Sequence, residues 1–182
     1  MNNFIENNDD RFANGQVNGD LRGNSDATQS GVQPEFPAPI GRFLGLKLLE
    51  AENGTAVVEF VADERHANPM GTLTGGVLCE ITDAAMGFAY YTTLAAGESF
   101  TALELKINFL RPVWKATLRA KAKVVRAGKL VGFIECDVVD EQERLVARAS
   151  STCLTLRGQL ADGRRVPPLA SEYMRSHSKA GR

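Results

Sequence analysis

Two glycines and a carboxylate in one segment could stabilise a developing negative charge and supply a base. Gly75 and Gly76 open a mostly apolar segment that runs to about Thr92, and Asp83 follows Gly75 by eight positions. Unpaired N–H groups and the dipole at the start of a helix favour an oxygen that acquires negative charge. A carboxylate in a partly apolar cleft has a raised pKa and is a good base or nucleophile while it stays ionised. The pattern therefore predicts an oxyanion-binding turn and a carboxylate base on one helix.

Asp83 has simpler interpretations, which the sequence makes less attractive. It lies more than two turns into the helix, too deep for an N-cap. It could point to solvent, but this helix has few polar residues, and we expect a partly apolar cleft instead. Glu80, about 60° away around the helix axis, could be a base or share a cleft with Asp83. The glycine pair could simply form a tight turn, and no phosphate-binding glycine pattern accompanies it.

Few other side chains offer catalytic chemistry. The two histidines are His66 and His177, and no GxSxG elbow supplies a serine nucleophile. His66 either takes part in catalysis or packs and hydrogen-bonds in a loop. Asn68 could polarise a carbonyl or form an Asx turn. The Thr101 hydroxyl could hold a water near a helix carboxylate or sit at the surface.

Composition excludes several classes of function. The chain has 21 Lys and Arg against 22 Asp and Glu, which argues against nucleic acid or an acidic membrane as a partner. Its three cysteines are far apart and form no CxxC pair, so we predict no disulfide framework and no metal site. No apolar run is long enough to cross a bilayer and no secretory signal pattern is present, so we expect a cytoplasmic protein.

The chain divides into three parts. Residues 1–34 are rich in Asn, Gly, Asp, Ser and Gln, and we expect a disordered tail there. Residues 35–157 form the predicted folded domain. Residues 158–182 are a basic, proline-containing extension.

The elements that position the candidate residues follow from hydrophobic periodicity. A helix at about 75–92 is apolar on nearly every side and should be central. Asn53-Gly54 indicates a hairpin, and the alternation from Leu103 to Phe109 indicates a half-buried strand. Since no helices separate the later strands, we predict an α+β fold in which a curved antiparallel sheet wraps around one long central helix. Strands are expected at 46–50, 55–61, 103–109, 118–125, 130–139 and 145–156, with a short helix or turn at 37–45.

These residues together resemble a known family over about residues 40 to 156. The resemblance is to the hotdog-fold acyl-CoA thioesterases of the phenylacetic-acid-degradation (PaaI) type, whose pattern is His-x-Asn-x-x-Gly-x-x-His-Gly-Gly followed by a helix reading Leu-x-Asp. In this chain Thr74 replaces the second histidine and the helix reads Ile81-Thr82-Asp83, with the spacing kept. The matching residues are His66, Asn68, Gly71, Gly75, Gly76, Asp83, the run Asn108-Phe109-Leu110-Arg111-Pro112 and the turn Gly128-Lys129.

The resemblance implies hydrolysis of an acyl- or aryl-acyl-CoA thioester. Asp83 would be the general base or nucleophile and the Gly75 N–H the oxyanion donor, while Asn68 orients the reacting groups and Thr101 positions the water. Gly87 stands where a related Glu-using group has a hydroxyl, so the chain resembles the Asp-using group. Coenzyme A belongs to the substrate, so no cofactor is implied. Substrate-binding roles are implied for His66, Thr74, Gly76, Arg111, Gly128 and Lys129.

The same resemblance implies an active site shared between two subunits. Asp83 and Thr101 of one subunit would face Asn68 and Gly75 of the other, in a homodimer that usually pairs into a homotetramer.

Two other functions stay open. His66 and Glu80 are fourteen positions apart, the spacing of the acid–base pair in hotdog dehydratases and hydratases of 3-hydroxyacyl and enoyl thioesters. Those enzymes follow the histidine with Phe-Pro and open the helix after Pro-Gly, unlike Ala67-Asn68 and Gly75-Gly76. A non-catalytic acyl-CoA-binding module is the other alternative, and the sequence does not predict the acyl group.

Overall fold

The computed structural model describes residues 36–164. The predicted tail at 1–34 and the greater part of the predicted extension at 158–182 lie outside the described residues, and the division into a domain and two tails stays a prediction. In chain order the elements are α1 (Pro39–Leu44), β1 (Lys47–Glu52), β2 (Thr55–Ala62), η1 (Glu64–His66), α2 (Gly75–Tyr91), β3 (Ser99–Phe109), β4 (Ala116–Ala127), β5 (Val131–Val139), β6 (Leu145–Leu156) and η2 (Gly158–Ala161).

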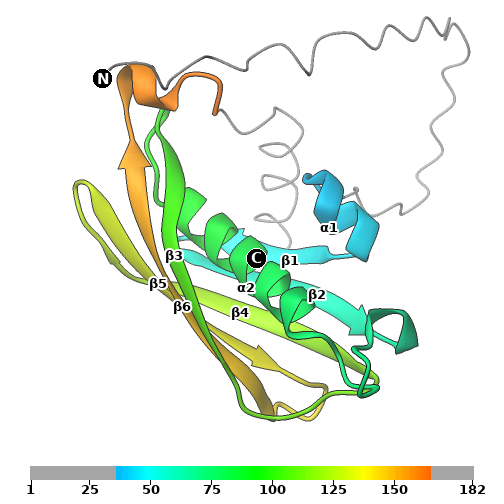
Figure 1. Ribbon diagram of the computed structural model, residues 1–182. Helices are drawn as coiled ribbons and strands as arrows, with labels where there is room; N and C mark the ends of the chain where they lie inside the picture. The colour runs from blue at the N-terminus through cyan, green and yellow to red at the C-terminus, as the bar shows by residue number, and fades with distance from the viewer. Residues whose placement is uncertain (1–35, 165–182) are drawn as a thin grey trace, which may run out of the picture. The chain divides into compact units, whose positions relative to one another are not determined.

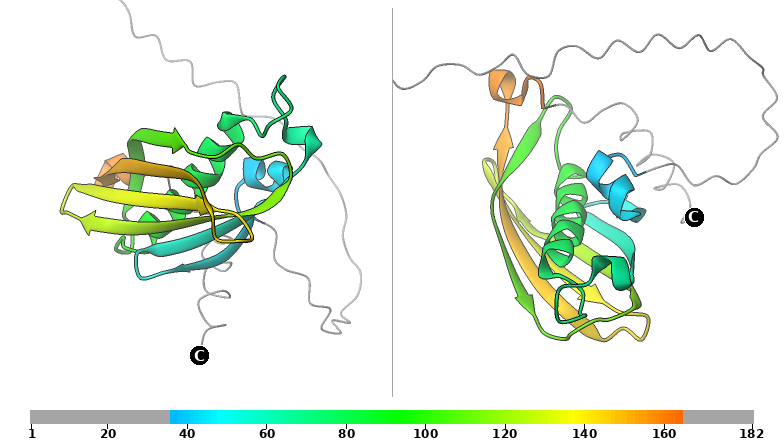
Figure 2. Two further views of the ribbon diagram at one scale, coloured as in Figure 1. Left: turned by 90° about the horizontal axis from the view of Figure 1, so that it is seen from below. Right: turned by 45° about the vertical axis from the view of Figure 1, so that its right-hand side comes forward.

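The six strands form one antiparallel sheet in the order β1-β2-β4-β5-β6-β3. Figures 1 and 2 show this sheet curving around α2, which lies across its concave face. The predicted α+β hotdog arrangement is confirmed. No helix within residues 36–164 is long and apolar enough to cross a membrane.

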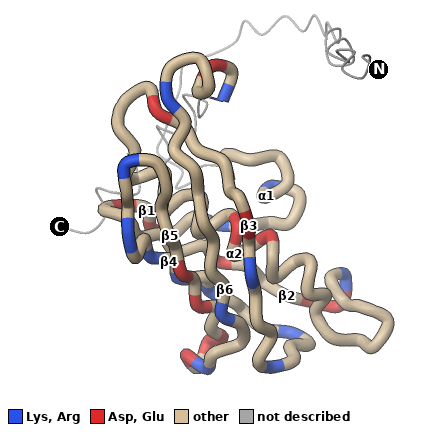
Figure 3. Tube along the Cα trace, turned by 60° about the vertical axis from the view of Figure 1, so that its left-hand side comes forward, with Lys and Arg blue, Asp and Glu red and all other residues tan. Residues whose placement is uncertain are grey.

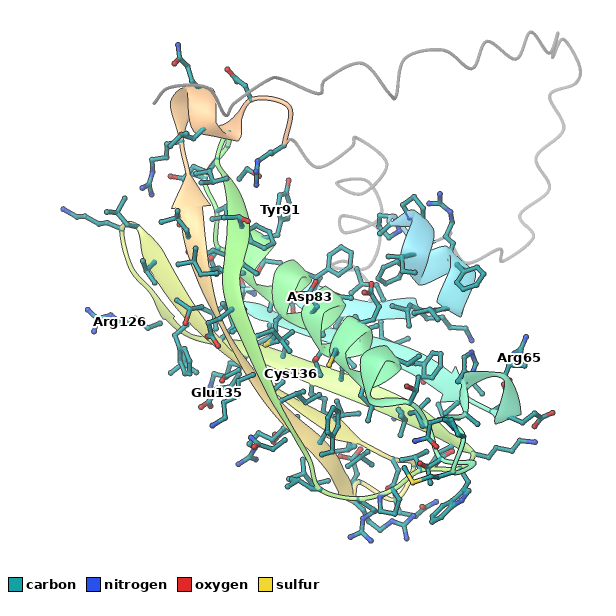
Figure 4. The ribbon with its side chains drawn as sticks, viewed as in Figure 1. Arg65, Asp83, Tyr91, Arg126, Glu135 and Cys136 are labelled. Atoms are coloured by element: carbon teal, nitrogen blue, oxygen red, sulfur yellow. The ribbon has the colours of Figure 1, made fainter. Side chains whose placement is uncertain are left out.

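The core lies between α2 and the sheet. Leu78, Ile81, Ala85 and Met86 on α2 are at most 4% exposed, and they meet fully buried residues of β2, β4 and β5. Burying each large aliphatic side chain contributes about 1.5–3 kcal/mol. This packing holds α2 in a fixed position. Gly75 is its first residue, and Asp83, labelled in Figure 4, lies midway along it.

The β1–β2 hairpin turns where the Asn53-Gly54 pair predicts it. Both residues have positive φ, 48° and 79°, the backbone region that such turns require. The Gly54 N–H donates to Thr92 Oγ1 at 2.8 Å, so the turn also anchors the carboxyl end of α2.

Strand β3 differs from its prediction. It begins at Ser99, four residues earlier than expected, and its apolar residues Leu103 and Phe109 are 57% and 55% exposed. The reason is its place at the edge of the sheet, where only β6 is hydrogen-bonded to it among the described strands. An irregularity in the pairing between Ala102 and Glu104 further disturbs the simple alternation.

The convex face of the sheet carries pairs of opposite charges. Glu59 on β2 pairs with Arg119 on β4 at 3.2 Å, and Arg148 on β6 pairs with Asp137 on β5 at 2.6 Å. Figure 3 shows Lys, Arg, Asp and Glu distributed along these strands. The same strands also expose apolar side chains, Val125 on β4 and Val131 and Phe133 on β5.

Candidate active site

The amino end of α2 has no side-chain cap. Thr74 occupies the N-cap position, but its side chain makes no cap hydrogen bond, and its N–H donates to the His66 carbonyl at 3.0 Å. The first N–H groups of a helix have no acceptor within the helix. The N–H groups of Gly75 and Gly76 therefore lie at the positive end of the helix dipole, and the Thr74 side chain does not accept a hydrogen bond from either of them.

Gly75 also has a packing reason to be glycine. A Cβ at this position would lie 2.8 Å from Cζ of Phe109, so the Phe109 ring sits directly over the Gly75 backbone. A Cβ at Gly76 would meet nothing within 4 Å. An apolar wall thus flanks one side of the helix opening.

Asn68 holds the loop that leads into α2. Its Oδ1 accepts from the N–H groups of Met70 at 2.9 Å and Thr72 at 3.3 Å, and its Nδ2 donates to Thr72 Oγ1 at 2.9 Å. This is the Asx-turn interpretation of Asn68. The structure places the carboxamide within its own loop, where it shapes the approach to Gly75.

His66 is likewise engaged locally. Its Nδ1 accepts from the Asp63 N–H at 3.2 Å, and its ring stacks edge-on against Phe60 with centroids 4.8 Å apart. Hydrogen bonds from Arg65 lower the pKa of Asp63 to about 2, so this carboxylate stays ionised beside the imidazole. The geometry matches the packing interpretation of His66 better than a catalytic one.

Asp83 is more exposed than the sequence predicts. On α2 only Gly76 and Asp83 are exposed, and they are two turns apart on the helix strip that faces away from the sheet. Partial burial among its neighbours nevertheless raises the pKa of the Asp83 carboxyl. In the single chain Asp83 therefore lies at an open surface rather than in a cleft.

Several groups share the surroundings of Asp83. Burial, followed by the charge of Asp83, raises the pKa of the Glu80 carboxyl and of the Cys79 thiol. The Cys153 thiol has a pKa raised first by burial, with a further contribution from the Asp83 charge. The sequence offered no signal for Cys153, because it comes to α2 from the last strand.

Gly75 and Asp83 cannot act on one carbonyl from the same chain. Eight residues of α-helix separate them by about 12 Å along the axis. An oxyanion donor and a base or nucleophile must both lie roughly 3 Å from the reacting atoms. Within one chain the two predicted catalytic groups are too far apart.

The structure does not bring Thr101 to Asp83. Phe100 packs edge-on against Tyr90 of α2 and pairs with Thr155 of β6, so it faces the helix. Because side chains alternate along a strand, Thr101 points to the other face together with its partner Leu154. The next helix-facing residue is Ala102, which carries no hydroxyl.

The residues predicted to contact coenzyme A lie at opposite ends of β4. Arg111 lines a pocket of about 300 Å³ next to Ala116, where β4 begins. Gly128 and Lys129 line another of about 440 Å³ beyond Ala127, where β4 ends. The 12 residues of β4 span roughly 36 Å along the strand. One chain does not gather the three residues around one ligand.

Gly128 has a local structural role as well. Its N–H donates to the Val131 carbonyl at 2.9 Å, and a Cβ there would lie 2.7 Å from that oxygen. The Lys129 carbonyl accepts from Arg157, which also pairs with Glu98 at 2.6 Å. Within residues 36–164 no group of three His, Cys, Asp or Glu is arranged to hold a metal ion.

Comparison with known proteins defines the class. The family model of the thioesterase superfamily matches residues 70–147. A protein of Saccharolobus solfataricus, provisionally named an esterase, is 36% identical over 118 residues, which is 65% of this chain and 84% of that protein.

Two further matches concern one protein of Escherichia coli. The acyl-coenzyme A thioesterase PaaI is 30% identical over 105 residues, 57% of this chain and 73% of the enzyme. The solved structure of the E. coli PaaI protein from the phenylacetic acid degradation operon has a TM-score of 0.63 at 27% identity, covering 66% of this chain and 86% of that one.

The chain belongs to the thioesterase superfamily. Within it, the strand order, the central α2 and these relatives place it among hotdog thioesterases of the PaaI type, whose chemistry is hydrolysis of a thioester.

Proposed function

We propose that this protein hydrolyses acyl- or aryl-acyl-CoA thioesters to the free acid and coenzyme A. The observation that carries the proposal is the pairing, on one helix, of an uncapped glycine amino end with a carboxylate whose pKa is raised. In a member of the thioesterase superfamily these are the two groups that acyl transfer needs.

The proposed reaction assigns one task to each group. Asp83 takes a proton from water as it adds to the thioester carbon, or attacks that carbon directly. The Gly75 N–H binds the oxygen that becomes negative as the tetrahedral intermediate forms. The C–S bond then breaks. In the general-base path Asp83 returns the proton to the departing sulfur; in the direct-attack path coenzyme A leaves as its thiolate, and water then hydrolyses the anhydride formed on Asp83 to release the free acid.

A second copy of the chain could bring an Asp83 and a Gly75 to the same thioester, although the two residues of one chain are too far apart. β3 presents an 11-residue edge with exposed Leu103 and Phe109, which is a surface suited to pairing with the same strand of a partner. A two-fold axis through paired β3 edges sets the two α2 helices side by side and antiparallel. We place Asp83 of one subunit opposite Gly75 of its partner, in a homodimer that pairs further into a homotetramer.

The remaining predicted site residues have unequal support. Asn68 fits a positioning role, since its carboxamide shapes the loop before Gly75. Thr74 leaves the helix end uncapped. The geometry offers no support for Thr101 as the water-holding hydroxyl, and we leave that role unassigned. Gly76, Arg111, Gly128 and Lys129 keep substrate-binding roles as proposals.

The dehydratase alternative gains nothing from the structure. It requires His66 as an acid or base, but the Nδ1 atom of His66 accepts a hydrogen bond from the Asp63 N–H and its ring packs against Phe60. Reversible addition of water to crotonyl-CoA, lost in His66→Ala, is the result that would favour it over hydrolysis.

A thiol-release assay over short, long and aromatic acyl-CoAs tests the proposal. Asp83→Asn keeps the size of the side chain but removes the base, so we expect kcat on the best substrate to fall by about 10²–10⁴-fold. Glu80→Gln is the matched control on the same helix and should retain most of the activity. Wild-type kcat in Asp83→Asn would show that the mechanism is wrong, and saturable binding without thiol release would favour a non-catalytic module.

A further inference from the structure

The ring of Phe109 occupies the space in which a side chain at position 75 would lie. A Cβ on Gly75 would be 2.8 Å from Phe109 Cζ and 3.3 Å from both Cε atoms, so the tip of the ring points at the first residue of α2. Gly75 does not have the positive φ that favours glycine, and alanine is well accepted in a helix. The contact with Phe109 therefore gives position 75 its reason to be glycine.

The ring also borders the space in front of the Gly75 N–H. In an α-helix the Cα–Cβ bond tilts toward the amino end, and the N–H groups point in the same direction. On the other side, a Cβ at Gly76 would meet nothing within 4 Å. The opening of α2 thus has a closed side, formed by Phe109, and an open side at Gly76 from which a thioester can approach.

Backbone hydrogen bonds hold the ring and the glycine in place. Phe109 is paired with the buried Ala147 of β6, and the N–H groups of the next two residues both donate to the Val146 carbonyl, at 2.9 and 3.1 Å. The Leu73 N–H donates to the Val113 carbonyl at 2.7 Å, which ties the loop before α2 to the chain that follows β3. The position of the ring over the glycine is therefore fixed from both elements.

Phe109 contributes little to the core in spite of this contact. Its side chain is 55% exposed, whereas Leu73 and Val113 beside it are 7% exposed. A hydrogen bond is stronger beside an apolar group than in water, because water lowers the electrostatic attraction and competes for the donor. A half-exposed ring next to a free N–H is suited to shielding that donor.

We propose that Phe109 is a positioning residue for thioester hydrolysis. Its ring keeps water from one side of the Gly75 N–H and holds the thioester oxygen against that donor as the substrate enters past Gly76. The proposal rests on the function proposed above, and it adds a residue that acts through the oxyanion donor instead of through the base. Phe109 should therefore affect turnover more than substrate binding.

The first test measures kcat and KM of Phe109→Ala separately in the thiol-release assay. We expect kcat to fall about tenfold while KM changes by less than about twofold, because a displaced donor weakens the transition state more than the bound substrate. Phe109→Leu keeps an apolar side chain and should restore kcat to within about threefold of the wild type. Leu110→Ala removes the next side chain, which is 56% exposed, and should keep the wild-type kcat, since the three atoms nearest to a Cβ at position 75 all belong to Phe109. An unchanged kcat in Phe109→Ala would overturn the proposal.

The second test asks whether the ring acts through Gly75. Gly75→Ala places a methyl group where the ring lies, so we expect kcat to fall about tenfold in the wild-type background. In Phe109→Ala this space is vacant, and the same substitution should change kcat by less than about twofold. A merely structural role of Phe109 would not produce this dependence. If Gly75→Ala has the same effect in both backgrounds, the proposal is wrong.

The assembly state provides a further control. Strand pairing uses the backbone of β3, so Phe109→Ala should elute like the wild type in size-exclusion chromatography. A smaller assembly that accompanies the loss of turnover would make Phe109 an interface residue and would overturn the proposal.

The assays also separate this proposal from the proposed function. If the wild type releases thiol and the substitutions at positions 75 and 109 act independently, the role of Phe109 fails while the proposed function stands. If the wild type releases no thiol from any acyl-CoA, the proposed function fails and the role of Phe109 fails with it.

Discussion

The two ends of α2 are built in opposite ways. At the amino end, Thr74 provides no cap, and the ring that covers Gly75 belongs to the half-exposed Phe109. At the carboxyl end, Tyr90 is 1% exposed and its hydroxyl lies 2.8 Å from Thr155 Oγ1, while Thr92 binds the β1–β2 turn. The amino end of α2 is uncapped, whereas its carboxyl end is hydrogen-bonded to β6 and to the β1–β2 turn. Under the proposed function, the carboxyl end of α2 contributes more to stability and the amino end is left free for the reaction.

The largest expected effect at the open end comes from removing one N–H. Gly75 occupies the first position of the helix, where proline is tolerated. The residue before a proline must have an extended backbone, and Thr74 has one. Gly75→Pro therefore deletes the proposed oxyanion donor without breaking α2. We expect kcat to fall by about 10²–10³-fold.

Gly75→Ala is the matched control for that substitution. It introduces the same clash with Phe109 but keeps the N–H. Equal kcat values for the two variants, with both folded by circular dichroism, would remove the oxyanion role from Gly75.

At the fastened end the expected effect is on stability. A Cβ at Gly132 would lie 2.0 Å from Cε2 of the buried Tyr90 ring. Gly132→Ala should therefore lower the free energy of unfolding by about 1–3 kcal/mol, measured by urea denaturation. Gly76→Ala, where the added Cβ meets nothing, should change it by less than about 1 kcal/mol. A neutral Gly132→Ala would mean that this end of α2 is not tightly packed.

The acidity of Asp83 gives a smaller, pH-dependent effect. Its pKa is raised by partial burial, and a base works only when deprotonated, so kcat/KM should decline as pH falls through a midpoint above the ordinary value of 3.8. In Glu80→Gln the midpoint should stay in place, because the pKa of Asp83 is raised by burial. A midpoint at or below 3.8 would contradict a desolvated base.

The same shift predicts a modest gain in stability when the charge is removed. A folded-state pKa above the unfolded value means that the protonated form is favoured, and this contribution is lost as pH rises through the folded pKa. Asp83→Asn should then unfold at a higher urea concentration than the wild type at pH 7, and the difference should vanish near pH 3. A stability loss at pH 7 would show that the carboxylate makes a stabilising contact instead.

The fold followed from sequence patterns because its signals are local. The Asn53-Gly54 turn and the apolar α2 each depend on a few neighbouring residues. The site was only partly predictable. Cys153 and Phe109 are brought near α2 by the pairing of β3 with β6, and strand order cannot be read from local sequence patterns. Thr101 faces away from α2 because Phe100 fixes the alternation of β3, and Asp83 is exposed because a helix strip faces away from the sheet.

The central claim is that Asp83 and Gly75 act together from different subunits. The test is to refold Asp83→Asn and Gly75→Pro chains together in equal amounts and measure thiol release. Half of the resulting dimers contain one chain of each kind, and each of these has one site with both native groups, so we expect about a quarter of wild-type activity from two inactive parents. If both groups act within one chain, every site keeps one defect, and a mixture no more active than its parents would contradict the account.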